Sequence, residues 1–415
     1  MKHARPRFAH ARSVAGPLLV SGGVWLAQVL GIPVQAREDR SPPASPGATQ
    51  TAYLDYRELS YGVATWNVPL DTQSAAFKKE PDLGLRNVVR GTMKFGNRAD
   101  QFIPFVWGQA QGKLYLDLNR NRDLTDDPGG VFSCSGPSRY SSYQTFTNVH
   151  LSFKTTEGTH PAFVDLHLYK YNQAGANVAS RSYWAGKISL HGREWQLGII
   201  EDASAKPGSA EGGYLLLRPW AARDQAFDLQ SGSLDGFRFC RDLFFGGEAY
   251  RLNCTYAQAG GTPQHRIDLE KRQAELGELK LTGKFIQRLV LPGAKFTVVL
   301  DQPEALVKVP VGTYGQCQVQ LRQGDAEAYR ESARYNLSPS EKVTTVSATK
   351  PAMLAVGGPL TNSVAVNRQG RALNLSYQLL GAGGEAYQLL GARRQPEFAA
   401  YRAGKKVASG KFEFG

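Results

Sequence analysis

The densest run of metal-ligand side chains in the sequence follows a predicted strand that ends near residue 116. Oxygen-bearing side chains stand at every second position of this run, and two further acids close it: Asp117, Asn119, Asn121, Asp123, Thr125, Asp126 and Asp127. Calcium takes about six to eight oxygen ligands, and a loop that turns alternate side chains inward can supply them. We therefore expect the 117–127 segment to bind a structural Ca²⁺ ion.

The spacing resembles the D-x-N-x-N loops of EF-hand and dockerin modules, which occur in many exported bacterial proteins. Leu124, at the eighth position, matches the residue that points into the core in such loops. Arg122 stands at the sixth position in place of glycine, and Pro128 stands at the twelfth in place of an acid. A left-handed backbone at a residue other than glycine costs about 1–2 kcal/mol. The alternative is an Asx-rich turn whose side chains cap their own backbone.

Patterns that would carry catalysis are scarce. The histidines beyond residue 36 lie at least seven positions apart, which excludes helix-borne H-E-x-x-H zinc sites; they are His150, His160, His167, His191 and His265. Neither a G-x-S-x-G elbow nor a Walker loop occurs. We expect a protein that binds or scaffolds without catalysis. The alternative is a divergent glycan hydrolase, in which Asp117 or the Glu201-Asp202 pair would supply the two carboxylates that a glycosidase needs.

The tryptophans offer a second kind of binding surface. Five remain beyond the first 36 residues: Trp66, Trp107, Trp184, Trp195 and Trp220. Trp184 and Trp195 flank a predicted hairpin and could share one face. Exposed coplanar rings would stack on sugars and make this a carbohydrate-binding protein, whereas aromatic residues in β-sandwiches more commonly fill the core.

Four cysteines occur, Cys134, Cys240, Cys254 and Cys317, and no C-x-x-C pair is present. Exported proteins can form disulfides. In a hairpin centred on Gly247, Cys240 and Cys254 would stand opposite each other. Cross-strand neighbours lie about 4.5–5.5 Å apart, within reach of a disulfide. The spacing therefore predicts a Cys240–Cys254 bridge.

The elements that must position these residues are predominantly strands. Apolar and polar residues alternate over 90–95, 164–169 and 187–190, which is the period of a half-buried strand. Glycine-containing turns recur between such runs, as at Gly96-Asn97, His191-Gly192 and Gly246-Gly247. Only His265–Leu276 and Ala326–Arg334 are predicted as short helices. The fold class is therefore all-β, with two or three tandem β-sandwich modules and few short helices.

We expect an N-terminal β-rich domain over 52–255, a β-sandwich module over 256–340 and an immunoglobulin-like β-sandwich over 341–415. A faint G-x-apolar-x-apolar repeat near residues 91, 186 and 277 has about the period of one sandwich module. The run Val309–Tyr314 resembles the V-P-x-G-x-Y hairpin of transthyretin-like and carboxypeptidase-regulatory-like modules. The stretches 370–387 and 404–415 resemble the C-terminal module of uncharacterised secreted bacterial β-rich proteins, a resemblance that implies no activity.

Residues 1–36 have the pattern of a secretory signal peptide. A basic head precedes an apolar stretch, and Val34-Gln35-Ala36 predicts cleavage after Ala36. The alternative is an uncleaved membrane anchor. A flexible Pro- and Ser-rich linker is expected over 37–51, and no transmembrane segment is expected after it. We therefore expect a secreted or periplasmic protein.

The charge of the mature chain indicates which partners to expect. Loss of four basic residues with the signal takes the formal charge from +13 to +9. This net positive charge is modest and spread along the chain, and basic residues are most concentrated at Arg393-Arg394 and Lys405-Lys406. The basic residues fit either an ordinary solvated surface or a surface that contacts an anionic envelope polysaccharide. The other partner that we expect is another exported protein. No nucleic-acid recognition motif is visible.

Overall fold

The computed structural model describes residues 49–72, 76–82, 87–134, 142–227, 229, 234–330, 343–370, 372–390 and 395–412. These residues form strands β1 to β31 and three 3₁₀ helices, and no α-helix occurs among them. The all-β prediction is therefore confirmed. The predicted signal peptide, most of the 37–51 linker and Arg393-Arg394 lie outside the described residues. The first strand of the described residues begins at Thr49, inside the predicted linker.

The N-terminal unit is a β-sandwich of two antiparallel sheets. The five-stranded sheet has the order β3 (Leu70–Asp71), β4 (Val88–Lys94), β5 (Phe102–Gly108), β6 (Lys113–Leu116) and β7 (Val131–Ser133). The four-stranded sheet has the order β2 (Ala64–Val68), β10 (Ala174–Ser180), β9 (Gly158–Lys170) and β8 (Tyr143–Thr155). The short helices η1 (Ala99–Gln101) and η2 (Pro128–Gly130) join its strands. Alternate side chains of both sheets meet in one core, with Phe105 and Trp107 from the first sheet and Phe146 and Leu166 from the second.

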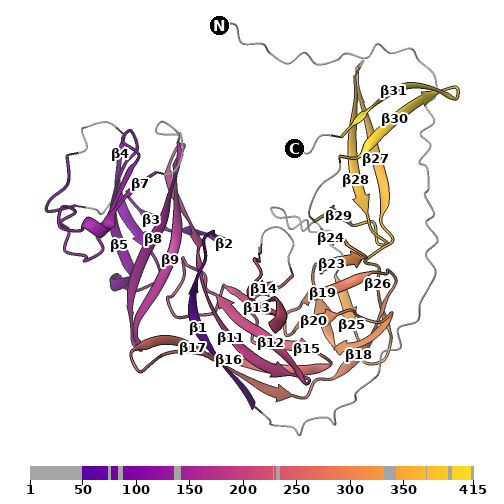
Figure 1. The fold of residues 1–415 in the computed structure, drawn as a ribbon, viewed down its shortest axis with the longest axis horizontal. Helices are drawn as coiled ribbons and strands as arrows, with labels where there is room; N and C mark the ends of the chain where they lie inside the picture. Colours follow the sequence, from indigo (N-terminus) through magenta and orange to yellow (C-terminus); the bar gives the residue numbers. More distant parts are fainter. Residues whose placement is uncertain are drawn as a thin grey trace.

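A sheet of 15 strands leads from this sandwich to the C-terminal part of the chain (Figure 1). Neighbouring strands are antiparallel except β15 and β20, which run parallel. The first half of the sheet has the order β14 (Gly236–Arg238), β13 (Tyr214–Pro219), β12 (Arg193–Ile200), β11 (Ser182–Leu190), β1 (Thr49–Glu58), β17 (Thr262–Arg272), β16 (Glu248–Ala259) and β15 (Asp242–Phe245). The sheet continues through β20 (Thr297–Asp301), β19 (Ile286–Pro292), β23 (Gln318–Gln323), β24 (Ala326–Arg330), β29 (Ala386–Leu389), β28 (Ala372–Leu380) and β27 (Thr361–Gln369). Helix η3 (Trp220–Ala222) follows β13.

Smaller sheets cover the far half of the long sheet. One has the order β21 (Leu306–Pro310), β18 (Leu276–Leu281) and β26 (Ala352–Leu354), and another pairs β22 (Gly312–Tyr314) with β25 (Thr344–Val346). Leu279 and Val309 of these sheets share a core with Leu289 and Val298 of the long sheet. The last hairpin, β30 (Glu397–Arg402) and β31 (Lys405–Lys411), lies beside β27 and β28 (Figure 1).

Several local predictions are wrong. His265–Leu276 and Ala326–Arg334 were expected as helices, but 265–272 belongs to strand β17 and 326–330 is strand β24, and residues 331–334 lie outside the described residues. The V-P-x-G-x-Y run is not a hairpin, because β21 pairs with β18 whereas β22 pairs with β25. Strand β16 crosses the predicted boundary at 255, and β26 and β29 pair with strands that precede residue 341. Sheets therefore continue across both positions, and the division into domains stays a prediction.

The predicted Cys240–Cys254 bridge is absent, and all four cysteines are free thiols. Asp242 pairs with Arg251, and Phe245 pairs with Glu248, so the turn is centred between Gly246 and Gly247 and not on Gly247. A half-residue shift of the turn centre changes the pairing register by one residue. Cys240 and Cys254 therefore no longer stand opposite each other, because a change of register by one residue turns a side chain to the opposite face.

Candidate metal centre

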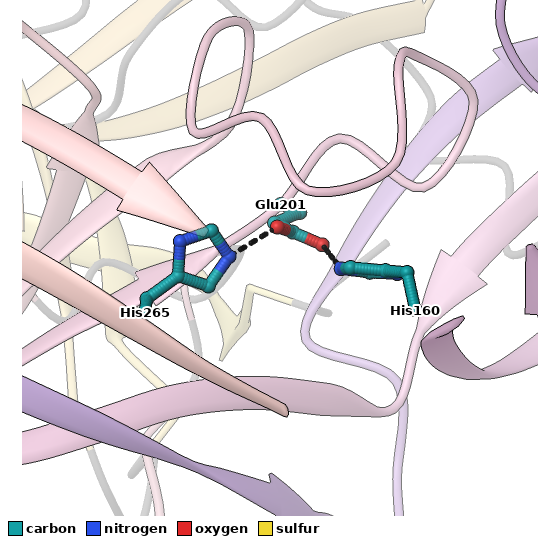
Figure 2. A group of neighbouring side chains, drawn as sticks. All are labelled: His160, Glu201 and His265. Carbon is teal, nitrogen blue, oxygen red and sulfur yellow. Dashed lines mark hydrogen bonds and ion pairs between the residues drawn. The ribbon is translucent and has the colours of Figure 1, made fainter. Parts of the chain in front are cut away.

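Three side chains from distant parts of the sequence converge where the sandwich meets the long sheet: His160, Glu201 and His265 (Figure 2). His160 lies near the start of β9, Glu201 directly follows the apolar end of β12, and His265 lies in β17. The group therefore links the four-stranded sheet of the sandwich to two strands of the long sheet.

Strand alternation turns both histidines inward. In β17, His265, Ile267 and Leu269 are buried and Arg266 between them is exposed. In β9, His160 begins the row of alternate residues that continues through the buried Val164 and Leu166. Glu201 enters the same region because the chain leaves β12 at its buried end.

The ligand atoms are close together. His265 Nε2 lies 2.6 Å from Glu201 Oε1, and His160 Nε2 lies 2.7 Å from Glu201 Oε2. All three ligand atoms lie within 4.8 Å of one another. The side chains of His160 and His265 are 3% and 0% exposed, and that of Glu201 is 12% exposed. The group is therefore almost completely removed from water.

His160 is poorly satisfied by protein groups. Its Nε2 lies close to Glu201, but both of its ring nitrogens are buried without a hydrogen-bond partner among the described residues. A buried polar group without a partner costs about 1–3 kcal/mol. A ligand that accepts the Nε2 lone pair would remove part of this cost.

His265 is held from its other side. Its Nδ1 lies 3.4 Å from the Sγ atom of Cys254, and its ring stands edge-on to Trp184 with 4.8 Å between centroids. Burial, and then the nearby Glu201 charge, raise the pKa of Cys254 to about 12, so its sulfur remains a neutral thiol. Such a contact orients the imidazole so that Nε2 faces the centre.

Trp184 and Tyr256 complete an aromatic wall. His160 lies 5.6 Å from Trp184 and 4.9 Å from Tyr256 between ring centroids. Tyr256 is fixed by its hydroxyl, which donates a 2.7 Å hydrogen bond to the carbonyl of Thr159. Burial raises the pKa of Tyr256 to about 12. The wall therefore holds both imidazoles and lowers the local polarity.

Glu201 remains ionised despite its surroundings. Burial alone would raise the pKa of Glu201, but the charges of the neighbouring His160 and His265 outweigh it and bring the pKa to about 2. The centre therefore presents a carboxylate to its two imidazoles near neutral pH.

A small pocket adjoins the centre. His160 and Glu201 form part of its lining, together with Trp184 and the turn that follows β12. The Glu201-Asp202 pair of the hydrolase prediction thus lies at this pocket, but Asp117 does not line it. The structure therefore does not bring Asp117 and the Glu201-Asp202 pair into one pocket.

The predicted calcium loop lies elsewhere, between β6 and η2, and its side chains form consecutive Asx turns. Asp117 is fully buried and accepts hydrogen bonds from the backbone N–H groups of Asn121 and Arg122 at 3.1 and 3.0 Å. Asn121 and Asp123 accept bonds from the backbone two residues further on. Arg122 has φ of 68°, the left-handed conformation that its position in the pattern implied.

The closing acids of this loop differ in environment. Asp126 accepts bonds from the amide groups of Asn119 and Asn121 at 3.1 and 2.6 Å. Asp127 is buried, and its Oδ2 has no hydrogen-bond partner among the described residues. Burial, followed by the charges of Asp117 and Asp126, raises the pKa of Asp127. These acids therefore share one region of negative charge.

The tryptophans do not form an exposed platform. Trp66, Trp107, Trp184 and Trp195 are buried in two cores, and Trp220 is half-buried with Lys187 and Arg223 against its ring. Stacking of a sugar across Trp184 and Trp195 would need surface that both rings bury in the core.

Sequence reasoning missed the His160–Glu201–His265 group. It compared histidines for helical spacing only, whereas these two lie on different strands. One local signal existed: His265 alternates with Ile267 and Leu269, which places it on a buried face.

No family model, curated protein or solved structure matches this chain. In the part of the chain that the structure describes, no helix has the length and apolar character needed to span a membrane.

Proposed function

We propose that this chain binds one divalent transition-metal ion, zinc in the first instance, between His160, Glu201 and His265. The observation that carries the proposal is the convergence of two buried imidazole nitrogens and a carboxylate within 4.8 Å. Two histidines and one carboxylate are an established ligand set for zinc.

The chemistry of the donors favours zinc over calcium. Imidazole nitrogen suits zinc, copper, iron and nickel, whereas calcium takes oxygen ligands. The ring nitrogens of His160 support a metal further, because both are buried without a hydrogen bond among the described residues although Glu201 lies close to Nε2. The competing interpretation is a structural His–Glu–His ion pair that binds no metal.

Zinc titration by calorimetry on the chelator-treated chain tests the proposal. We expect one zinc per chain, and a loss of binding in His160→Ala, His265→Ala and Glu201→Gln. Glu201→Gln preserves the size of the side chain and so separates loss of a ligand from loss of packing. The matched control is His150→Ala, because the His150 side chain is 64% exposed and lies outside the group. Undiminished zinc binding in all three centre variants would refute the proposal.

We propose a second, calcium site in the 117–127 loop. The buried Oδ2 of Asp127, which lacks a hydrogen-bond partner, supports it beyond the Asx turns themselves. Calorimetry with Ca²⁺ should show binding that Asp127→Asn weakens and Arg122→Gly strengthens, since glycine relieves the left-handed turn and removes a cation. Asp123→Asn should matter less, because the seventh position supplies its backbone carbonyl. Absence of any heat at millimolar Ca²⁺ would reduce the loop to a series of Asx turns.

The wider role that we propose is that of an exported binding or scaffolding protein, stabilised by these ions. The signal-peptide pattern over 1–36 and the scarcity of catalytic motifs support it. Its partner would be an envelope polysaccharide or another exported protein. A glycan and envelope-polymer binding screen on the secreted chain, with N-terminal sequencing, tests both parts; a chain that starts at Met1 in the cytoplasmic fraction would contradict export.

A further inference from the structure

We infer that the metal in the His160–Glu201–His265 centre keeps one coordination position open toward the adjoining pocket, and that water or a small monoanion occupies it. This inference rests on the proposed zinc site. It makes the centre one at which an exogenous ligand can exchange, which a purely structural ion pair could not offer.

The ligand count leads to an open position. Among the described residues, no fourth His, Cys, Asp or Glu joins the three ligands in one cluster. Structural zinc sites have four protein ligands, whereas three protein ligands leave a position for water or substrate.

The pocket reaches the centre from one side. His160 and Glu201 line it, His265 does not, and the turn after β12 contributes small residues to the lining, including Ala203 and Ala205. The space open to the centres of water molecules is about 20 Å³. A site needs about 10–15 Å³ measured in this way to hold one water. The pocket therefore has room for one water molecule or for a ligand little larger.

The charge of the centre selects the ligand. A divalent ion beside one carboxylate and two neutral imidazoles retains one net positive charge, which favours hydroxide or another monoanion. The apolar wall of Trp184, Phe153 and Pro161 strengthens this attraction because it excludes water. Asp202 lines the same pocket, and its Oδ1 accepts hydrogen bonds from the backbone and hydroxyl of Ser204 at 2.9 and 2.6 Å. Its negative charge weakens the attraction for every anion, and most strongly for multiply charged anions.

Cobalt substitution tests the inference. The purified chain is loaded with Co²⁺, and its visible d–d absorption is followed while azide is added as the probe anion. We expect a saturable spectral change. Ala205→Phe and Ala203→Leu fill the pocket from two positions outside the ligand set. Each variant should retain the cobalt spectrum of the wild-type chain and bind azide at least tenfold more weakly in this titration.

The outcomes separate the two proposals. Failure of the chain to bind Co²⁺, or equal binding by His265→Ala, would overturn the metal site and this inference together. Cobalt that is bound by the three residues but gives no response to azide would overturn only the open position. An azide response of unchanged size in both pocket variants would show that the ligand does not arrive through this pocket, and would also overturn the inference.

Discussion

Zinc should raise the melting temperature of the wild-type chain, and His265→Ala should abolish that rise. His265 is fully buried, and its Nε2 faces Glu201 at 2.6 Å, so no other described histidine can replace it at that position. A ligand that binds only the folded state stabilises it by RT ln(1 + [L]/Kd), which is about 2.7 kcal/mol at a 100-fold excess over Kd. One kcal/mol corresponds to about 2–4 °C for a unit of 150–250 residues. The expected shift is therefore about 5–11 °C.

The same variant has a second expected effect without metal. Removal of one partner from a buried ion pair costs about 3–5 kcal/mol, because the remaining charge loses its compensation. Metal-free His265→Ala should therefore melt below metal-free wild type, as measured by scanning calorimetry after chelation. His150→Ala should behave as wild type in both conditions. An equal zinc shift in wild type and His265→Ala would refute the reasoning, because the ion would then bind elsewhere.

Three further predictions concern the scaffold and its response to pH. Gly186→Ala should destabilise the chain by about 1–3 kcal/mol in urea titration, since a Cβ there would overlap the backbone of β1, whereas Gly129→Ala, which meets open space, should be close to neutral. Arg288→Ala should lower the free energy of unfolding by about 3–5 kcal/mol, because the buried Arg288 guanidinium donates hydrogen bonds to two backbone carbonyls and a carboxylate. In the same assay, the exposed ion pair of Arg272 with Glu270, at 3.9 Å, should contribute about 0–1 kcal/mol. The pKa of Glu201 falls from 4.5 to about 2 on folding, so its contribution to stability is complete above pH 4.5 and is lost as the pH falls toward 2. Metal-free Glu201→Gln should therefore show a weaker acid dependence of its unfolding free energy in that range; an unchanged dependence would contradict the ion pair.

The fold class was predictable from local alternation because burial on one face of a sheet imposes a period of two. The stretches 90–95, 164–169 and 187–190 lie in or at the ends of β4, β9 and β11, and the turn at Gly246-Gly247 joins β15 to β16. Leu124 is buried against Val106 as its place in the loop pattern predicted. These features depend on neighbours close in sequence.

The errors concern pairings that local sequence does not specify. Strand β1 begins the described chain and pairs with β11 and β17, so the centre of the long sheet joins segments far apart in sequence. The His160–Glu201–His265 group depends on this topology, since its members come from β9, the end of β12 and β17. The disulfide prediction failed for a smaller reason, because a turn of Gly246 and Gly247 together shifts the register by half a residue.

X-ray absorption spectroscopy of the zinc-loaded chain tests the central claim most directly. Zinc held by His160, Glu201 and His265 should show only nitrogen and oxygen neighbours, at about 2.0–2.2 Å, with the outer-shell scattering of two imidazoles. His150→Ala should leave this spectrum unchanged, and His265→Ala should remove the scattering of one imidazole or the bound metal itself. A sulfur neighbour at about 2.3 Å, which would place Cys254 or another thiol on the metal, or a spectrum without histidine scattering, would contradict the proposed centre.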